Sequence, residues 1–480
     1  MLAGKGQYVQ DGGMNEYRPT IGLEVHAELN TRTKMFCSSA NNPEETNPNV
    51  NVCPVCMGHP GTLPVINREA VEHVLRVGTA LGSTRADYTE FDRKSYFYPD
   101  IPKGYQISQY KYPLVSGGML RDVAITRVHL EEDTARSSHA GGISLVDFNR
   151  AGVPLMELVT EPVIHDAKTA GDFARELQLL LRTLGASHAN LEKGEMRIEA
   201  NVSVSKDGTM AKKYVEVKNI NSFRAVERAI EYEIERQISL IESGGAVSQE
   251  TRGWDENTQK TFSQRVKEGS ADYRYFPEPD LPKLVLSEVP DWKEDVLLAS
   301  LPELPWQRRT RYEGLGLKSE DTLSLVNDLS RAAYFDSLCQ SFAGDVTLLQ
   351  IAANYLINDI GEAEPPVASA FEELVRMIAG DQISSRGAKD ILKILMNDRG
   401  SSAMEVAKDG GFLQESNPDA LRALVQAVLS ASPTVVEEYR AGKESVLQFL
   451  VGQGMKASKG SGNPALLREL IIEEITKYSS

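Results

Sequence analysis

The chain has 480 residues, too many for one compact hydrophobic core, so its length predicts two or three domains. Its 68 acidic and 52 basic residues give a net charge of −16, which excludes a general polyanion-binding protein with a wholly basic surface. The sequence has no apolar run of about 18 residues and no basic start followed by an apolar core, so we expect neither a membrane span nor a secretory signal.

Four cysteines in a chain of this length favour a reducing compartment over a disulfide scaffold, and we therefore expect a cytoplasmic protein. Residues 1–18 are polar and contain several glycines, so they are expected to form a flexible N-terminal tail.

Residues 21–29, IGLEVHAEL, alternate between apolar and polar side chains and predict a β-strand. The apolar side chains would lie on one face. Glu24, His26 and Glu28 would lie on the other, since successive strand side chains point to opposite sides. A strand whose polar face carries two carboxylates and an imidazole is unusual, so this row is the first candidate for a functional site.

Further alternating runs at residues 197–205 and 214–219 predict antiparallel strands with one apolar and one polar face. The chain also predicts three amphipathic helices: one over 69–81, one that starts after an N-cap at Asp166 and stops at Gly185, and one over 226–241. Strands with covering helices indicate an α+β domain.

Six prolines between residues 277 and 305 interrupt the chain, and the pattern after them is helical. Asp321 is expected to cap a helix over residues 322–335, and a second helix is expected over 347–359. The stretch NDRGSS at 397–402 predicts a linker before a smaller helical unit that runs to the end of the chain.

Acidic residues recur at the polar positions of several predicted strands. Those of residues 21–29 are joined by Glu131, Glu132, Glu157, Glu199 and Glu216. Like charges gathered on one sheet face must be neutralised, and Mg²⁺ would do so while bridging to phosphate oxygens. The cations that would suit such phosphates are Lys94, Lys103, Arg197 and Lys218. The alternative is a solvated polar face held by surface ion pairs.

Three cysteines, Cys37, Cys53 and Cys56, have the knuckle spacing of a structural Zn²⁺ site. Ser39 occupies the position at which a C-x-C pair would supply a fourth cysteine, and serine is a poor zinc ligand. His59 is another candidate for the fourth position. The alternative is a loop that packs without metal.

Three further segments have both a functional and a structural interpretation. Residues 91–110 and 271–282 combine aromatic, charged and turn residues, which is typical of functional loops but also of loops that aromatic side chains anchor to a surface. Residues 451–467 carry Lys456 and Lys459 and no acid, and predict a basic loop before a helix capped near Asn463. This loop would suit a nucleic-acid backbone, or would serve only as a turn between helices.

Together these segments resemble one family: the B subunits of the bacterial aspartyl/glutamyl-tRNA amidotransferases (the GatB family). The matching stretches are IGLEVHAEL, VCPVCMGHPGTLPVIN, FDRKSYFYPDIPKGYQISQY, HLEEDTARSSH, DFNRAGVPLMELVTEP, VEVKNINSF and SADYRYFPEPDLP. They run in the family's order from about residue 19 to 282, and VGQGMKASKGSGNP resembles the family's tail domain.

The resemblance implies a catalytic cradle over 19–293 with a glutamine-synthetase-like antiparallel sheet, a helical domain over 294–407, and a YqeY-like tail domain over 408–480 that meets tRNA. It implies that ATP and Mg²⁺ activate the side-chain carboxylate of misacylated Glu-tRNA(Gln), Asp-tRNA(Asn) or both. Ammonia from the amidase, or A, subunit of such an enzyme would then displace phosphate. A small C subunit would join the two larger chains into a heterotrimer.

By the same resemblance, Mg²⁺ would be held by Glu24, His26, Glu132, Glu157 and Glu216. Lys94 and Lys103 would line the ammonia route or contact phosphates, and ATP would meet Arg197, Glu199, Glu216 and Lys218. Strand alternation places Glu131 on the face of His129, whereas the family spacing favours Glu132; a bulge would reconcile the two. The competing functions are an ATP-dependent ligase acting on a free small acid and a non-enzymatic tRNA-binding scaffold.

Overall fold

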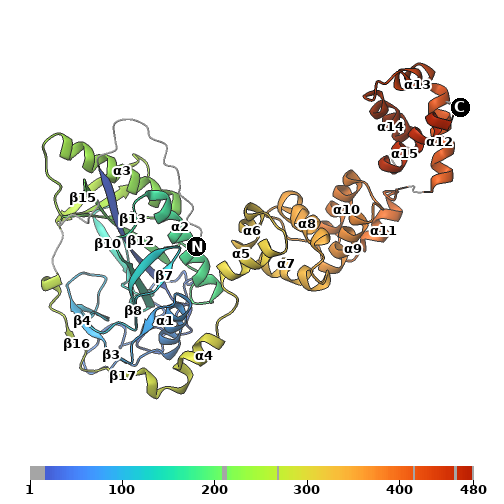
Figure 1. Ribbon diagram of the computed structural model, residues 1–480. Coiled ribbons are helices and arrows are strands. Elements are labelled where there is room, and N and C mark those ends of the chain that lie inside the picture. The colour runs from blue at the N-terminus through green and yellow to red at the C-terminus, as the bar shows by residue number, and fades with distance from the viewer. Residues whose placement is uncertain (1–16, 208–212, 267–269, 415–416, 459–461, 478–480) are drawn as a thin grey trace. The chain divides into compact units, whose positions relative to one another are not determined.

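The computed structural model describes residues 17–207, 213–266, 270–414, 417–458 and 462–477. The chain divides into two compact units, one up to Pro305 and one from Trp306 onward (Figure 1). A large sheet with packed helices builds the first unit and helices build the second, so the α+β class is confirmed. Most of the tail expected over 1–18 lies outside the described residues, although Arg18 already belongs to the first strand.

The first unit is built on a ten-stranded sheet in the order β15-β14-β13-β12-β1-β11-β8-β6-β2, with β7 beside β8. Its strands are β1 (Arg18–Glu28), β2 (Thr84–Arg85), β6 (Val115–Ser116), β7 (Met119–Leu120), β8 (Val123–Glu132), β11 (Pro154–Thr160), β12 (Met196–Ser205), β13 (Val215–Ile220), β14 (Glu250–Asp255) and β15 (Lys260–Val266). The strand predicted at 21–29 is β1, and it lies between β11 and β12.

The predicted antiparallel pairing holds for the sheet with one exception among the described strand pairs. Strands β13 and β14 pair in parallel, whereas the other described pairs of the sheet are antiparallel. Helix α3 (Phe223–Glu242) connects β13 to β14, and parallel neighbours need such a crossover.

Three helices pack on the first unit's sheet: α1 (Arg68–Ala80) on β6 and β8, α3 on β12, β13 and β15, and α2 (Ala167–Thr183) beside α3. The apolar residues of β1 are 0–1% exposed, so burial of this face stabilises the sheet. Asp166 caps α2 by accepting from the Thr169 amide at 2.7 Å, and Gly185 follows the helix at φ +66°, both as predicted.

The buried stripe of α3 differs from the prediction in its second half. Val226 and Ile230 are buried, but Glu233 and Gln237 take the next buried positions and are 0% and 1% exposed. Glu233 is accommodated because Arg236 donates to it at 2.6 and 2.9 Å. A buried acid with a hydrogen-bonded cation therefore lies where the apolar face of the predicted amphipathic helix was expected to continue, and Ile234 and Ile238 are only partly buried.

The smaller strands form three further sheets. They are β3 (Tyr88–Thr89) with β17 (Leu284–Val285), β4 (Asp92–Ser95) between β5 (Tyr105–Ser108) and β16 (Phe276–Pro277), and the hairpin β9 (Arg136–Ala140) with β10 (Ile143–Asp147). The remaining short elements are η1 (Ser270–Tyr273), η2 (Leu286–Glu288), η3 (Pro290–Trp292) and α4 (Glu294–Ala299). The pairing of β16 with β4 brings the two aromatic segments, 91–110 and 271–282, together.

The second unit is helical. Its first helices are α5 (Pro305–Gly314), α6 (Ser319–Val326), α7 (Leu329–Ser341), α8 (Val346–Tyr355), the π-helical turn η4 (Leu356–Ile360), α9 (Ala368–Ala379), α10 (Ser385–Asn397) and α11 (Ala403–Asp409). The cap predicted at Asp321 is wrong, since Asp321 lies in the first turn of α6. Asp328 caps a separate helix, α7, by accepting from the Ser330 amide at 2.9 Å. A second capping acid thus splits the predicted run.

The tail has its own apolar core, formed by helices α12 (Pro418–Ala431), α13 (Pro433–Arg440), α14 (Val446–Ala457) and α15 (Pro464–Lys477). The boundary expected at residue 408 lies within α11, which packs on α9 and α10. Residues 451–457 were predicted as a basic loop, but they continue α14, where Gly454 packs against Leu467. Asn463 caps α15 as predicted, accepting from the Ala465 amide at 2.9 Å.

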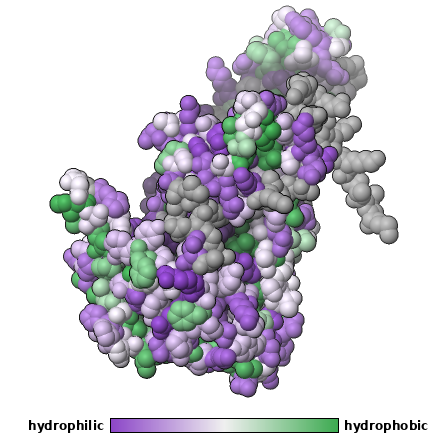
Figure 2. All heavy atoms as spheres, turned by 90° about the vertical axis from the view of Figure 1, so that its left-hand side faces the viewer, coloured by the Kyte–Doolittle hydropathy of each residue, from purple (hydrophilic) through white to green (hydrophobic). Residues whose placement is uncertain are grey.

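No described helix has the length and apolar character needed to cross a membrane. In the view of Figure 2, hydrophilic residues cover most of the visible surface, and apolar residues are scattered among them. Scattered exposed apolar side chains are normal for a folded chain and need no partner.

Candidate active site

The polar face of the sheet gathers acids and imidazoles from neighbouring strands. In the β1–β11 register His26 lies opposite Glu157, and in the β8–β11 register Glu157 lies opposite His129. On the other side of β1, Glu24 lies opposite Glu199. The pairing of these antiparallel strands therefore turns separate sequence motifs into one continuous row.

The centre of this row is the His26 imidazole. Its Nε2 atom lies 3.4 Å from Glu131 Oε1, 3.4 Å from Glu157 Oε2 and 3.8 Å from Glu24 Oε1. His129 Nε2 lies 3.4 Å from the same Glu157 oxygen. We call these five residues, Glu24, His26, His129, Glu131 and Glu157, the acidic cluster.

The structure brings Glu131 into the acidic cluster and leaves Glu132 out. No register shift occurs between His129 and Glu132, so the expected bulge is absent and the two glutamates point to opposite faces. The Glu132 carboxylate instead accepts hydrogen bonds from the Lys103 ammonium and, at 2.9 Å, from the Ile107 amide. The predicted assignment of Glu132 beside His26 is therefore wrong in this structure.

His26 and Glu157 hold their charges against burial, whereas Glu24 does not. Burial disfavours the imidazolium of His26, but hydrogen bonds and charges from Glu131 and Glu157 outweigh it and raise its pKa well above the usual value. Burial also opposes ionisation of Glu157, yet His129 and His26 hold its pKa well below the usual range. Burial and the neighbouring Glu157 raise the pKa of Glu24 to about 7.

The acidic cluster fits a hard divalent cation. Single ligand atoms of Glu24, His26 and Glu157 lie within 4.8 Å of one another, and the same holds for His129, Glu131 and Glu157. The Nδ1 atoms of both histidines are buried without a protein hydrogen-bond partner. Three carboxylates supply the oxygen ligands that Mg²⁺ prefers. Without metal, the positive charge of the His26 imidazolium balances the carboxylates of Glu131 and Glu157, and a bound cation would take over this role.

The predicted ATP-contacting residues lie on the same face but form two groups. Lys218 Nζ lies 2.7 Å from Glu199 Oε2 and 3.8 Å from Glu216 Oε1. Ligand atoms of Glu24, Glu199 and Glu216 also lie within 4.8 Å of one another, so Glu24 connects this group to the acidic cluster. The structure does not place Glu216 beside Glu157, because β1 and β12 separate their strands.

Arg197 belongs to the second group, at the other end of β1. Its Nη2 atom lies 3.0 Å from Asp133 Oδ2, and Arg150 Nε lies 3.6 Å from the same oxygen. Burial would raise the pKa of Asp133, but Arg197 and Arg150 outweigh it and lower the value to about 2. Burial and Asp133 raise the pKa of the adjacent Glu28 to about 8. Asp133 and Arg150 were not predicted from the sequence. Asp133 follows Glu131 by two residues, and this spacing, which places strand side chains on the same face, could have indicated it.

Lys94 approaches the acidic cluster from β4. Burial lowers its pKa, but the charges of Glu131 and other nearby groups outweigh this effect and raise it. Its Nζ atom lies 5.0 Å from the ring centroid of Tyr273 and 5.7 Å from that of Tyr96. A cation fixed between aromatic rings and carboxylates suits an anionic group that approaches the cluster.

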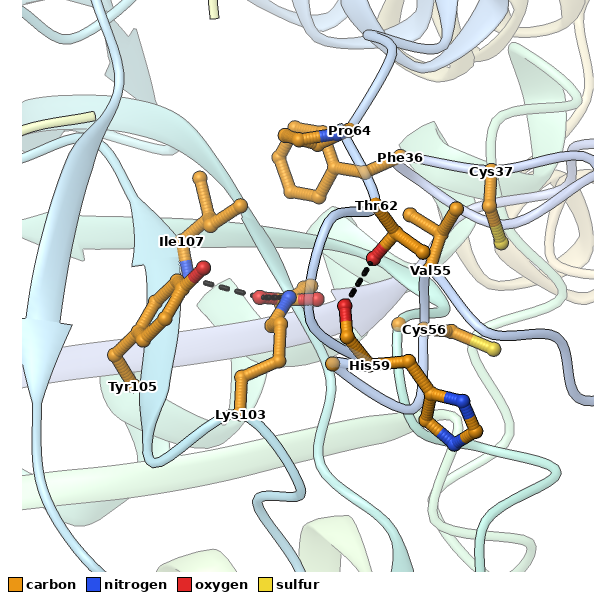
Figure 3. Close-up of a pocket in the computed structure, with 13 residues that line it drawn as sticks. Phe36, Cys37, Val55, Cys56, His59, Thr62, Pro64, Lys103, Tyr105 and Ile107 are labelled. Carbon is orange, nitrogen blue, oxygen red and sulfur yellow. Dashed lines mark hydrogen bonds and ion pairs between the residues drawn. The ribbon is translucent and has the colours of Figure 1, made fainter. Parts of the chain in front are cut away.

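Lys103 and Glu132 line a separate pocket of about 80 Å³ together with Phe36, Cys37, Cys56 and Tyr105. In Figure 3 the Lys103 side chain enters this pocket from one side, and Cys37 and Cys56 lie on the other. Lys94 and Lys103, which the sequence suggested as one pair, therefore serve different environments. Glu132 is 5% exposed, so its pairing with Lys103 satisfies a buried charge.

Three cysteine thiols form a compact group beside this pocket. Sulfur atoms of Cys37, Cys53 and Cys56 lie within 4.8 Å of one another, and the Cys53–Cys56 distance is 3.9 Å. Ser39 Oγ lies 3.8 Å from Cys56 Sγ, whereas His59 is not part of the group. A hydrogen bond from Cys37 is the main cause that lowers the pKa of Cys56 to about 4. Three thiols and one hydroxyl fit a tetrahedral metal with one weak ligand.

The tail lysines are only partly described. Lys456 lies exposed in the last turn of α14, and Lys459 lies outside the described residues.

The fold and its polar face define a class of protein: an α+β unit with a buried acidic face, followed by helical domains. Comparison with known proteins narrows this class. Residues 19–290 match the family model described as the GatB/GatE catalytic domain, and residues 338–475 match the GatB domain. The chain therefore belongs to the family of aspartyl/glutamyl-tRNA amidotransferase B subunits.

Individual relatives agree over nearly the whole chain. A chloroplastic/mitochondrial glutamyl-tRNA(Gln) amidotransferase B subunit of Physcomitrium patens is 43% identical, covering 96% of this chain and 86% of the relative. The aspartyl/glutamyl-tRNA(Asn/Gln) amidotransferase B subunits of Crocosphaera subtropica and Thermus thermophilus are 42% and 43% identical, covering 95% and 96% of this chain and 97% and 99% of the relatives.

Proposed function

We propose that this chain is the B subunit of a tRNA-dependent amidotransferase, a glutamine-dependent carbon–nitrogen ligase. It would convert Glu-tRNA(Gln), Asp-tRNA(Asn) or both into the amidated forms. The observation that carries the proposal is the acidic cluster on the polar face of β1, in a chain whose relatives bear this activity in their names. An ATP-dependent ligase for a free small acid would leave the helical tail without a role.

The chemistry explains why such a face is needed. A carboxylate is a poor electrophile, because hydroxide or oxide is a poor leaving group. Transfer of the γ-phosphoryl group of ATP to a side-chain carboxylate oxygen gives an acyl phosphate, and ammonia then displaces phosphate at the carbonyl carbon. Phosphoryl transfer asks the protein mainly for positioning and charge neutralisation. It requires no nucleophilic serine or cysteine.

The chain's own residues divide this work. Glu24, Glu131, Glu157 and His26 would hold Mg²⁺, which neutralises phosphate charge when bound. Lys94 would attract the incoming carboxylate, and Lys218 and Arg197 would contact phosphate oxygens after exchanging their present acidic partners. Glu199 and Glu216 hold Lys218 in place, so they act as positioning residues.

We propose that ammonia comes from an amidase A subunit, which a small C subunit joins to this chain. The relatives are named as B subunits, and such a name implies a multi-chain enzyme. The Lys103–Glu132 pair would line part of the ammonia route, since the pair is buried beside a small pocket. We propose a cytoplasmic location for this chain, in a reducing compartment, and all four cysteines are free.

Two further parts of the proposal concern the thiol group and the tail. Zn²⁺ would bind Cys37, Cys53 and Cys56, with Ser39 or water as the fourth ligand. The tail domain, together with Lys456 and Lys459, would meet tRNA through its backbone, because a chain of net charge −16 needs a local positive feature to dock RNA.

The test is a transamidation assay of the assembled complex with ATP, glutamine and each misacylated tRNA in turn. We expect ATP-dependent formation of Gln-tRNA(Gln), Asn-tRNA(Asn) or both. Amidation of free glutamate or aspartate without tRNA would contradict the proposal and favour the small-acid ligase.

A further inference from the structure

Four tyrosines form a continuous strip where the two aromatic segments pair. Tyr96 and Tyr273 meet edge to face at 5.9 Å between ring centroids, and Tyr273 and Tyr275 do so at 6.1 Å. Tyr275 and Tyr110 are stacked, with centroids 4.3 Å apart and an interplanar angle of 12°. We call Tyr96, Tyr110, Tyr273 and Tyr275 the tyrosine strip.

The inner end of the tyrosine strip adjoins the acidic cluster. Lys94 Nζ lies near the rings of Tyr96 and Tyr273, and Lys94 interacts electrostatically with Glu131 and Glu157. Any molecule that lies along the strip and reaches past Lys94 therefore enters the site where a carboxylate would be activated. The strip is an approach surface to that site.

The outer end of the strip is open. Tyr110 is 52% exposed, and its stacking on Tyr275 is its only ring contact within the described residues. An aromatic side chain stacked on one face and exposed elsewhere is a platform for another flat ring. Nucleobases stack on such platforms with little sequence preference, because every base has a π-face.

Two exposed cations are neighbours of the platform residues in the sequence. Lys111 follows Tyr110, and its Nζ atom lies 5.0 Å from the ring centroid of Tyr112. Arg274 lies between Tyr273 and Tyr275 and adopts a left-handed backbone with φ +47°. Such a conformation is costly for a residue with a side chain and tends to occur at functional sites. Asp92 is buried and accepts from the Tyr110 and Lys111 amides at 2.9 and 3.3 Å, and its charge and that of Glu90 act on the Lys111 ammonium.

We propose that the tyrosine strip binds the unpaired 3′ end of the aminoacylated tRNA, with the terminal base stacked on Tyr110 and adjacent phosphates held by Lys111 and Arg274. This inference rests on the proposed function and adds the place where the substrate's nucleoside end docks. The amino acid is an ester of the terminal ribose, so only that ribose and the amino acid itself separate the terminal base from the carboxylate that is activated. The strip, whose inner end adjoins the acidic cluster, offers aromatic groups on the approach to that site.

The exposed ring of Tyr110 could stack on the base of tRNA or on the base of ATP, because both ligands carry a purine ring. In the proposed function, the phosphates of ATP would be contacted by Lys218 and Arg197 on the polar face of the sheet, which now pair with Glu199 and Asp133. The exposed Lys111 and Arg274, which are sequence neighbours of Tyr110 and Tyr275, provide further cations for a second, extended polyanion. The charge distribution therefore favours tRNA as the source of the stacked base.

The experiment is a double-mutant cycle on the assembled complex, using Tyr110→Ala and a tRNA shortened by its unpaired 3′ nucleotides. Tyr110→Ala should weaken binding of intact tRNA by about fivefold to 150-fold, the range found for single base–aromatic stacks. It should cause no further loss with the shortened tRNA, because the stacked base is already absent. Tyr110→Phe keeps the ring and should bind intact tRNA within about twofold of wild type.

A matched control removes an exposed aromatic side chain outside the tyrosine strip, on the large sheet. Phe262 is 46% exposed on the edge strand β15, and Phe262→Ala should leave tRNA binding unchanged. Lys111→Ala should reduce the slope of log K against log salt by about 0.7, the value of one single-strand phosphate contact. Unchanged melting temperatures would show that these variants remain folded.

Three results would overturn the inference. Equal losses with intact and shortened tRNA would show that Tyr110 does not contact the 3′ end. A weaker Kd for ATP with normal tRNA binding would assign the platform to the nucleotide. Dissociation of the assembled complex would assign it to a protein interface. Because binding is measured without turnover, a complex that binds tRNA but amidates nothing refutes the proposed function and leaves the strip intact.

Discussion

Replacing Glu157 by glutamine should remove the charge on which the acidic cluster depends. Glu157 Oε2 lies 3.4 Å from both His26 Nε2 and His129 Nε2, and its other oxygen lies 3.4 Å from Arg127 Nη2. Truncating one partner of a buried, hydrogen-bonded charge pair costs about 2–5 kcal/mol, which corresponds to about 30-fold to 5,000-fold in affinity. We therefore expect Mg²⁺ affinity to fall by this factor in Glu157→Gln.

The assay is a Mg²⁺ titration of ATP cleavage that depends on misacylated tRNA. Glutamine keeps the volume and hydrogen-bonding capacity of glutamate, and His26 retains Glu131 as a partner, so the variant should stay folded. Glu161→Gln is the matched control, because Glu161 is exposed and its carboxylate accepts a hydrogen bond from the neutral Thr126 hydroxyl at 2.8 Å. A Glu157→Gln enzyme with the metal dependence of wild type would refute the assignment of Glu157 to the cation site.

The remaining predictions concern pH, the thiol group and the tail. Since folding raises the pKa of His26, the contribution of this residue to stability is present below the unfolded value of 6.5 and is lost as pH rises through the folded value. The melting temperature of the metal-free protein should therefore fall as pH rises above neutral, and it should fall less in His26→Gln. Metal analysis should find about one Zn²⁺ per chain, absent in Cys53→Ser together with a lower melting temperature, whereas metal-free wild type would support packing without metal. The double variant Lys456→Ala and Lys459→Ala should raise the KM for tRNA and leave the KM for ATP unchanged. Its dependence of tRNA binding on salt should weaken by the equivalent of about two phosphate contacts, with Lys443→Ala as the control. An unchanged salt dependence would mean that the two lysines contact no RNA.

The parts of the fold predicted from sequence are those that local periodicity and capping determine. The alternation of β1 placed Glu24 and His26 on one face, and Asp166 and Gly185 marked both ends of α2. Local signals fail where two of them compete. Asp321 and Asp328 are both residues of a type that caps helices, but only Asp328 caps one in the structure, whereas Asp321 lies in the first turn of α6.

The site was predicted less completely, because cross-strand register determines it. His129 and Glu131 join His26 only through the register of β8, β11 and β1, which no single strand encodes. The same holds for Asp133, which directly follows β8 and contacts both Arg197 of β12 and Arg150 of the loop before β11. The parallel pairing of β13 and β14 likewise depends on the packing of α3, a long-range feature that alternation alone does not contain.

The central claim is that a side-chain carboxylate is activated as an acyl phosphate on the polar face of β1. Isotope transfer tests it directly, using misacylated tRNA whose side-chain carboxylate carries oxygen-18. The carboxylate oxygen that attacks the γ-phosphorus leaves with phosphate when ammonia attacks the carbonyl carbon. We therefore predict one labelled oxygen in the phosphate released for each amide formed, and neither labelled phosphate nor amide from Glu157→Gln at a Mg²⁺ concentration that saturates only the wild type. Amide formation with unlabelled phosphate would contradict the mechanism.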